Sequence, residues 1–282
     1  MIVTRFAPSP TGLLHLGHAY AAITARDAAR GGRFLLRIED IDLGRAREEF
    51  VDAIYEDLAW LGLEWETPVL RQSTRFDAYL AALTQLGDLL YPCFCTRKDI
   101  ADEIARAGEA PHGPEGPLYP GTCRHLSQDE REARIASGES YALRLDVKRA
   151  SEMTGPLSFE ERGSGPHGEH GMIAVDPLLF GDVVLARKDI PASYHLAVVV
   201  DDAFQGVNLV TRGNDLFSAT HVQRLLQALL GLPAPAYAHH KLILDEQGHK
   251  FSKRDRSVTL RDLRERGETP EIIRAHLFHK GI

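Results

Sequence analysis

The feature that most constrains the fold of this chain is its N-terminal stretch, in which a strand, a turn-rich loop and a helix follow one another. Residues 2–7 predict a short strand, and the sequence Pro-Ser-Pro-Thr-Gly at 8–12 predicts a loop. An alanine-rich pattern at 14–30 predicts a helix. A helix that begins directly after a loop points its backbone N–H groups and the positive end of its dipole at that loop, which favours the binding of a phosphate.

Two histidines lie at the start of this predicted helix. His15 and His18 are three residues apart, so they share one face of the helix. Both rings can donate hydrogen bonds to phosphate oxygens, and Gly17 lets a nucleotide approach the backbone closely. A His-x-Gly-His sequence also arises by chance, so this motif alone does not establish a nucleotide site.

Length and composition indicate an ordinary globular protein. The 282 residues suffice for one large or two smaller domains, and 44% of them are hydrophobic. We expect a cytoplasmic protein without a membrane span, because no apolar run is long enough to cross a bilayer and no leader precedes the first strand. The net charge of −7 predicts that any RNA site is a local basic patch.

The sequence Lys-Phe-Ser-Lys-Arg at 250–254 forms a second motif far downstream. It follows a strand-like segment, 242–244, and a turn, 245–248. Together with the histidine motif, it resembles the HIGH and KMSKS signatures of class I aminoacyl-tRNA synthetases, in the order that this family has them. Similarity to the glutamyl branch of the class covers nearly the whole chain and is carried by RFAPSPTGLLHLGH (5–18), LRIEDID (36–42), YHLAVVVDD (194–202) and VTRGNDL (210–216).

The resemblance implies a doubly wound α/β fold of the Rossmann type, built on a parallel sheet. The catalytic domain would comprise residues 1–90 and 191–282. The alternation of strands and helices breaks down at 91–190, which predicts an insertion between the two halves. In the family this insertion meets the acceptor end of tRNA.

The resemblance also implies an ATP site that works with Mg²⁺. In the family, the counterparts of four residues act on the triphosphate: His15, His18, Lys250 and Lys253. The counterparts of three others contact ATP: Pro8, Gly17 and Ser252. The motif departs from the family pattern because Phe251 replaces a Met or Leu and Arg254 replaces the final Ser. We therefore expect its loop to differ in packing and mobility.

Candidate amino-acid-binding residues lie at the ends of predicted strands. Glu39 ends a strand at 33–42, and Arg212 follows a strand at 207–210. We also predict a strand at 194–202, buried on both faces, because this run is nearly continuously apolar. The family's counterparts of five residues bind glutamate: Arg5, Ser9, Glu39, Tyr194 and Arg212. Glu39 would hold the α-ammonium group and the arginines the two carboxylates; which arginine takes which carboxylate stays open.

Amphipathic patterns predict three further helices, at 45–61, about 75–90 and 218–230. Four residues of the first are expected to face the core: Phe50, Ile54, Leu58 and Leu61. Four residues of the second are expected to do the same: Phe76, Tyr79, Leu80 and Leu83.

The predicted insertion contains all three cysteines of the chain: Cys93, Cys95 and Cys123. Three thiolates and one further ligand would make a tetrahedral zinc site. By general ligand chemistry the fourth ligand is His112 or His125, whereas resemblance to the short members of the glutamyl branch implies Tyr119. The alternative is that the cysteines are small buried hydrophobic residues without a metal.

The lysine motif is followed by only 28 residues, too few for the anticodon-binding domain of ordinary glutamyl synthetases. This resembles the short members of the branch, which attach glutamate to the queuosine base of tRNA(Asp). The resemblance thus implies a ligase that activates L-glutamate with ATP, transfers it to queuosine-containing tRNA(Asp), holds one structural Zn²⁺ and acts as a monomer.

Three other functions remain open at this point. The chain could be a minimal glutamyl-tRNA synthetase that charges a tRNA 3′ end. A small nucleotidyltransferase would use the histidine motif but would not need the five glutamate-binding residues together. A non-catalytic synthetase paralogue would keep the fold but is expected to have lost a histidine or Lys253, and all are present.

Overall fold

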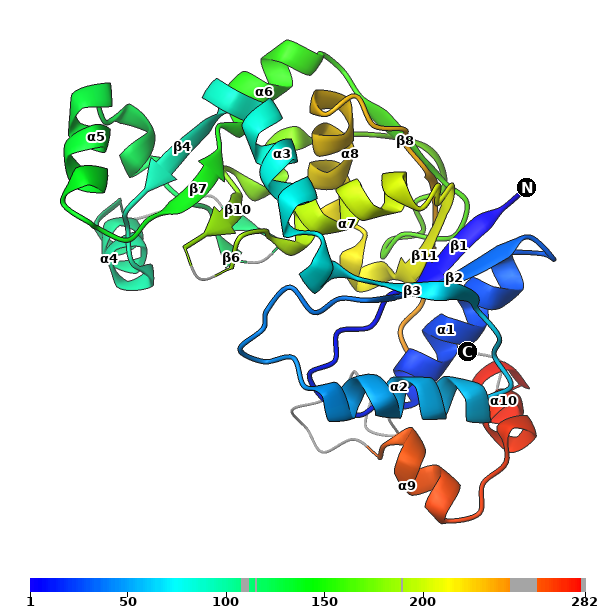
Figure 1. The fold of residues 1–282 in the computed structure, drawn as a ribbon. Helices are drawn as coiled ribbons and strands as arrows, with labels where there is room; N and C mark the ends of the chain where they lie inside the picture. Colours follow the sequence, from blue (N-terminus) through cyan, green and yellow to red (C-terminus); the bar gives the residue numbers. More distant parts are fainter. Residues whose placement is uncertain (108–111, 115, 189, 244–257, 280–282) are drawn as a thin grey trace.

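The computed structural model describes residues 1–107, 112–114, 116–188, 190–243 and 258–279. Its first half is a parallel sheet in which β1 (Val3–Phe6) pairs with β2 (Arg33–Ile38), and β2 pairs with β3 (Glu66–Arg71). Helix α1 (Leu16–Ala28) connects β1 to β2, and α2 (Glu48–Trp60) connects β2 to β3. Both helices lie on one face of the sheet (Figure 1) and pack against it through a shared apolar cluster.

The second half continues the parallel arrangement. Strand β11 (Leu209–Gly213) pairs with β12 (Ala236–His240), and α8 (Ala219–Leu229) connects them. The Asn208 N–H donates a hydrogen bond to the Val3 carbonyl at 3.2 Å, which holds the start of β11 beside β1. The predicted α/β fold with a parallel sheet is therefore confirmed.

The segment between the two halves divides between two sheets. Strands β4 (Leu90–Cys93), β7 (Ala142–Leu145) and β10 (Val184–Arg187) form an antiparallel sheet of their own, which projects to one side in Figure 1. Strand β8 (Ser158–Glu161) instead pairs in parallel with β12, and β9 (Gly171–Ala174) pairs with β8. This segment thus contributes strands to the same sheet as β11 and β12.

The remaining elements of this segment lie around the antiparallel sheet. Helices α4 (Arg97–Ala107) and α5 (Gln128–Ala136) lie at its far end in Figure 1. The short hairpin of β5 (His112–Gly113) and β6 (Gly116–Pro117) lies beside β10 instead. Helix α6 (Val147–Thr154) follows β7 directly.

The C-terminal helices return to the first half of the chain. Helices α9 (Leu260–Glu265) and α10 (Pro270–His279) lie beside α2 and α1, respectively (Figure 1). The Leu260 N–H donates to the Leu14 carbonyl at 2.8 Å, so α9 is anchored on the loop that carries the first histidine. No helix of the described residues is long and apolar enough to cross a bilayer.

The predicted strand at 194–202 is wrong, because this run forms helix α7 (Tyr194–Phe204). The Ser193 hydroxyl accepts a hydrogen bond from the Leu196 N–H at 3.4 Å and caps the helix. Most of α7 is buried between α3 (Phe76–Leu86) and α8. A helix that is apolar nearly all round has the same sequence pattern as a strand buried on both faces.

Two further predictions differ from the structure. Leu80 was expected in the core but is 61% exposed, whereas Tyr79 and Leu83 are buried. Residues 242 and 243 are not in a strand, since β12 ends at His240. Residue 244 and the motif at 250–254 lie outside the described residues.

Candidate functional site

His15 at the start of α1 and His18 in its first turn lie together, with ring centroids 3.8 Å apart. His15 is the N-cap of α1, and its Nδ1 accepts a hydrogen bond from the Gly17 N–H at 3.2 Å. The Nδ1 of His18 accepts from the His15 N–H, also at 3.2 Å. Because Nδ1 is an acceptor in both rings, the neutral form of each carries its proton on Nε2, which can donate to an anionic oxygen.

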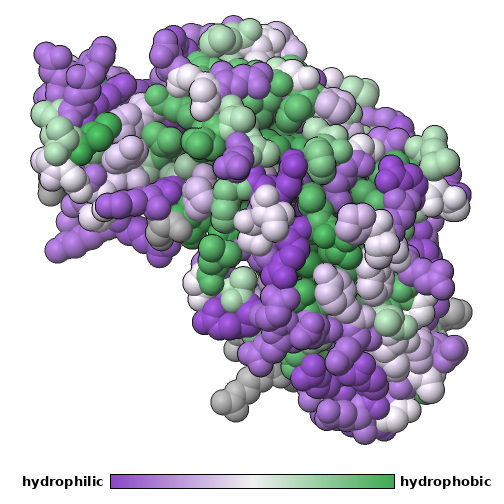
Figure 2. All heavy atoms as spheres, viewed as in Figure 1, coloured by the Kyte–Doolittle hydropathy of each residue, from purple (hydrophilic) through white to green (hydrophobic). Residues whose placement is uncertain are grey.

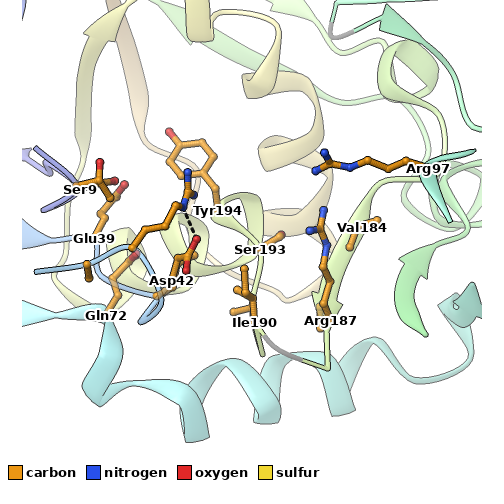
Figure 3. A pocket seen from close by; sticks show the side chains of 16 residues that line it. Ser9, Glu39, Asp42, Gln72, Arg97, Val184, Arg187, Ile190, Ser193 and Tyr194 are labelled. Carbon is orange, nitrogen blue, oxygen red and sulfur yellow. Dashed lines mark hydrogen bonds and ion pairs between the residues drawn. The ribbon is translucent and has the colours of Figure 1, made fainter. Parts of the chain in front are cut away.

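A cavity of about 400 Å³ lies between the part of the chain that contains β1, β2 and β3 and the antiparallel sheet. Three of the predicted glutamate-binding residues line it: Ser9, Glu39 and Tyr194. Figure 3 shows Arg97 and Arg187 reaching toward it from the opposite side. The space-filling view in Figure 2 shows the molecule hollowed between these two parts.

Arg212 is not among the described residues that line this cavity, but it contacts Tyr194, which is one of them. It is 6% exposed, and four of its five N–H donors have partners in the described chain. These partners and their distances are His239 Nε2 (3.0 Å), Gln223 Oε1 (2.8 Å), Thr220 Oγ1 (2.8 Å) and the Tyr194 hydroxyl (3.4 Å). All four are uncharged groups, so no described carboxylate neutralises this buried guanidinium.

Arg5, also outside the described lining, has the opposite environment. Its Nε and Nη2 donate to the two carboxylate oxygens of Asp202, at 3.0 and 3.3 Å. Arg37 donates to Asp202 at 2.7 Å and to Glu39 at 3.1 Å, which places Glu39 at the end of a buried network of two cations and two anions. This network balances its own charge.

The network also shifts the pKa of its carboxyl groups. Burial raises the pKa of Glu39 above its ordinary value, although Arg37 and Arg5 act in the opposite direction. Burial has the same effect on Asp202, but Arg5 and Arg37 outweigh it and hold the pKa of Asp202 below its ordinary value. A bound ammonium group would therefore stabilise the ionised form of Glu39.

Sequence reasoning did not identify several of these contact residues. Arg37 lies within the apolar run Phe-Leu-Leu-Arg-Ile, and a buried arginine there requires an acidic partner, which was an available signal. The partner, Asp202, could not be found because α7 was taken for a strand. Nothing in the local sequence marks Thr220, Gln223 or His239 as contacts of Arg212.

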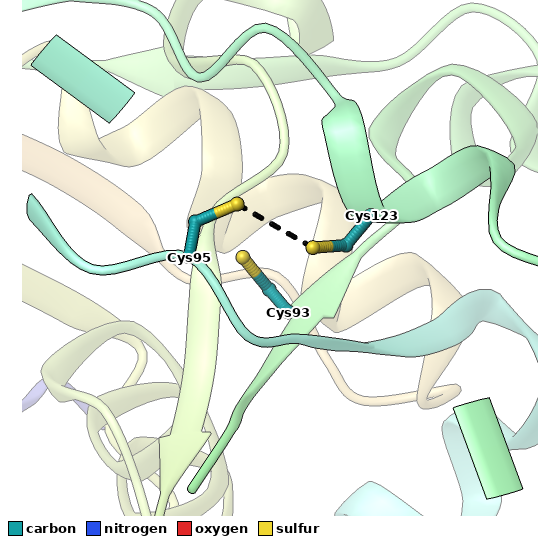
Figure 4. Close-up of side chains that lie close together, drawn as sticks. All are labelled: Cys93, Cys95 and Cys123. Carbon is teal, nitrogen blue, oxygen red and sulfur yellow. Dashed lines mark hydrogen bonds between the residues drawn. The ribbon is translucent and has the colours of Figure 1, made fainter. Parts of the chain in front are cut away.

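The three cysteines converge, although Cys123 lies far along the chain from the other two (Figure 4). Their sulfur atoms all lie within 4.8 Å of one another, and Cys95 Sγ is 3.4 Å from Cys123 Sγ. The Tyr119 hydroxyl is 3.7 Å from Cys95 Sγ and accepts a hydrogen bond from the Cys123 N–H. Three sulfurs with a phenol beside them fit a four-coordinate metal site.

Of the two histidines considered as a fourth ligand, only His125 can be placed relative to this cluster. His125 is not in the group of ligand atoms, and the side chain of His112 lies outside the described residues. Without a metal, burial raises the pKa of Cys95 to about 12. A bound cation would reverse that shift, since metal ligation requires the thiolate.

The predicted lysine-motif residues, Lys250, Ser252 and Lys253, lie outside the described residues. The segment that follows them reaches the start of α1, because Thr259 forms a β-bridge with His15. Thr259, five residues after the end of the motif, therefore lies beside His15.

Comparison with known proteins adds to this geometry. A family model described as tRNA synthetases class I (E and Q), catalytic domain, matches residues 1–282. The Glutamyl-Q tRNA(Asp) synthetase of Rhodobacter capsulatus is 49% identical over 283 residues, covering 97% of this chain and 98% of the relative. A Glutamate--tRNA ligase of Hydrogenobaculum is 41% identical over 97% of this chain and 57% of its own length. The crystal structure of a glutamate tRNA ligase from Elizabethkingia meningosepticum, in complex with its amino acid, matches with a TM-score of 0.72 and 28% identity, over 90% of this chain and 52% of that one.

Proposed function

We propose that this chain activates L-glutamate with ATP and transfers it to RNA. The chain belongs to the family of class I tRNA synthetases for glutamate and glutamine and is a ligase. The observation that carries this proposal is the buried, unneutralised charge of Arg212 behind Tyr194, at a cavity that also presents Glu39. A cation and an anion at such a cavity complement the carboxylate and ammonium groups of an amino acid.

Each residue then has a defined task in binding glutamate. Glu39 accepts hydrogen bonds from the α-ammonium group, and Ser9 hydrogen-bonds the amino acid. Arg212 offers its remaining N–H to one carboxylate, while Tyr194 shapes the site between them. Arg5 is the candidate for the other carboxylate, with its orientation fixed by Asp202.

Activation proceeds without a protein nucleophile. A carboxylate oxygen of glutamate attacks the α-phosphorus of ATP, the bond to the bridging oxygen breaks, and pyrophosphate leaves with the electron pair. His15 and His18 donate from Nε2 to phosphate oxygens, and Pro8 and Gly17 shape the loop beneath the nucleotide. Lys250, Ser252 and Lys253 contact the triphosphate, and Mg²⁺ neutralises part of its charge.

We propose queuosine-containing tRNA(Asp) as the RNA acceptor. Support comes from the relatives at 49% and 46% identity, both of which are named Glutamyl-Q tRNA(Asp) synthetase. A hydroxyl of the modified base would attack the acyl carbon of the adenylate and release AMP. The segment 91–190 serves as the proposed RNA-contacting insertion between the domain halves 1–90 and 191–282, and the enzyme acts as a monomer.

Cys93, Cys95, Tyr119 and Cys123 are the proposed ligands of one structural Zn²⁺. When bound, the ion would cross-link the end of β4 to the turn at Cys123. Because protein atoms fill all four positions, it would take no part in the chemistry.

The test is ATP–pyrophosphate exchange with purified protein in the absence of tRNA. L-Glutamate should support exchange, whereas glutamine and aspartate should be poorer by roughly 100-fold or more, because each would leave a buried charged group unpaired. Exchange that runs equally well with glutamine would refute the assignment of the two arginines. No exchange with any amino acid would refute the activation function.

A further inference from the structure

We propose that His239 and Glu161 form a buried relay that orients Arg212 for glutamate and links it to the inserted segment. The inference deepens the proposed function, because it rests on Arg212 as a ligand of the substrate carboxylate. Both residues lie outside the cavity lining and are positioning residues, which act through Arg212.

The relay consists of two consecutive hydrogen bonds. Arg212 Nε lies 3.0 Å from His239 Nε2, and His239 Nδ1 lies 2.6 Å from Glu161 Oε2. The exposed fractions of Arg212, His239 and Glu161 are 6%, 2% and 1%, so water does not compete for these bonds. The three residues come from three adjacent strands, β11, β12 and β8.

The donor in the first bond fixes the protonation of the whole relay. A guanidinium N–H can only donate, so His239 Nε2 must be an acceptor and carries no proton. The single proton of the neutral ring is then on Nδ1, where it is donated to the Glu161 carboxylate. A doubly protonated ring would set an N–H against the Arg212 N–H and a positive charge beside the guanidinium.

Because the neutral His239 ring lies between Arg212 and Glu161, Arg212 keeps the positive charge that a substrate carboxylate requires. Arg5 contacts Asp202 directly and is neutralised by it. In the relay, Glu161 fixes the histidine instead of the arginine, so Arg212 is held in place yet keeps its charge for a ligand carboxylate. Pre-organised binding groups of this kind require such supporting partners.

Glu161 is itself fixed by the backbone of both strands that it joins. Its Oε1 accepts hydrogen bonds from the His239 N–H at 2.9 Å and from the Gly163 N–H at 2.8 Å. A β-carbon on Gly163 would lie 2.2 Å from the His239 carbonyl oxygen, so only glycine permits this approach. The inserted segment is therefore locked onto the strand residue that supports Arg212.

The surroundings of His239 favour the neutral ring that the relay requires. Burial lowers its pKa, the hydrogen bond to Glu161 raises it, and the charge of Arg212 lowers it, with a net result below the ordinary value of 6.5. The other titratable groups facing the ring are Tyr237, whose ring stacks at 6.0 Å, and His240. Protonation should therefore disturb glutamate binding only below pH 6.5.

The test measures the KM for glutamate, the KM for ATP and kcat in pyrophosphate exchange between pH 5 and 8. His239→Leu removes both bonds and should raise the KM for glutamate about tenfold to a hundredfold, the range expected for a lost hydrogen bond to a charged group. The KM for ATP and kcat should change little. In the wild type, the KM for glutamate should rise as the pH falls below 6.5.

Two conservative variants separate positioning from bulk packing. His239→Gln keeps one acceptor and a donor but does not titrate. It should therefore restore much of the affinity and reduce the rise at low pH to the part that protonation of Glu39 causes. Glu161→Gln removes the charge that favours the imidazolium, so the rise should move to lower pH. Its single amide oxygen cannot accept all three hydrogen bonds of the carboxylate, so the KM for glutamate should also be higher than in the wild type at neutral pH.

The matched control is His221→Leu, which removes another buried histidine that also bonds to the inserted segment. His221 Nδ1 accepts from the Asp176 N–H at 2.9 Å, and its described ring contacts are Phe159 and Phe217 rather than Arg212. This variant should lose stability without a change in the KM for glutamate. Equal KM values for His239→Leu and the wild type would refute the relay alone, whereas an inactive wild type would refute the proposed function and the relay with it.

Discussion

Replacing Arg212 with methionine should separate affinity from stability. The substitution removes four hydrogen bonds, each worth about 1.5–3 kcal/mol because the guanidinium is charged, and a buried charge whose desolvation costs several kcal/mol. These terms have opposite signs, so we expect the free energy of unfolding to change by less than about 2 kcal/mol.

Glutamate binding should respond much more strongly to the same change. Loss of the cationic partner of a buried carboxylate costs about 2–5 kcal/mol, which corresponds to a drop in kcat/KM for glutamate of roughly 30-fold to several thousandfold. Pyrophosphate exchange measures this drop, and urea denaturation of the same preparation measures stability.

Arg5→Met is the matched control, because Arg5 is an equally buried arginine with a carboxylate partner. Its removal leaves Asp202 and Glu39 to share Arg37, and breaking such a buried pair costs about 3–5 kcal/mol of stability. The reasoning would be refuted if Arg212→Met destabilised the protein as much as Arg5→Met, or if it left the kcat/KM for glutamate unchanged.

Three further outcomes are expected. Elemental analysis of protein purified without chelator should find one zinc per chain, and Cys95→Ser should release it; metal-free protein would refute the site. Labelled glutamate should attach to queuosine-containing tRNA(Asp) even after periodate oxidation of the 3′ end; abolition of attachment by that oxidation would instead identify an enzyme that charges the 3′ end. Burial raises the pKa of Asp57 to about 6 despite Arg264 at 3.8 Å, so the contribution of this carboxyl to the stability of the wild type should fall as the pH rises from about 4 to 7. Asp57→Asn lacks this titration, so its melting temperature relative to the wild type should rise over that interval; a constant difference would contradict the assignment.

The sequence predicted local and periodic features of the structure well. The strand, loop and helix around His15 were predicted as the structure has them, and the two motifs indicated the family, which the family model confirms. The convergence of the cysteines also followed from their spacing and the resemblance. These features depend on residues near one another in sequence, or on patterns shared across a family.

The remaining features depend on burial and on partners distant in sequence. Helix α7 has the composition of a buried strand because its surroundings are apolar on nearly every side. Arg37 and Asp202 meet across 165 residues, and no local pattern pairs them. The contacts of Arg212 arise from three separate elements, so only the packed structure reveals that its charge is left unneutralised.

The parallel pairing of β8 with β12 has a consequence for how the chain is synthesised and folds. Glu161 leaves the ribosome 76 residues before its partner Tyr237, so the β8–β9 hairpin must wait with one edge unpaired. An exposed strand edge invites association with other chains, and a charged side chain on that edge opposes it. The Glu161 carboxylate, which is buried in the folded enzyme, would thus protect the nascent chain from aggregation until β12 pairs with β8.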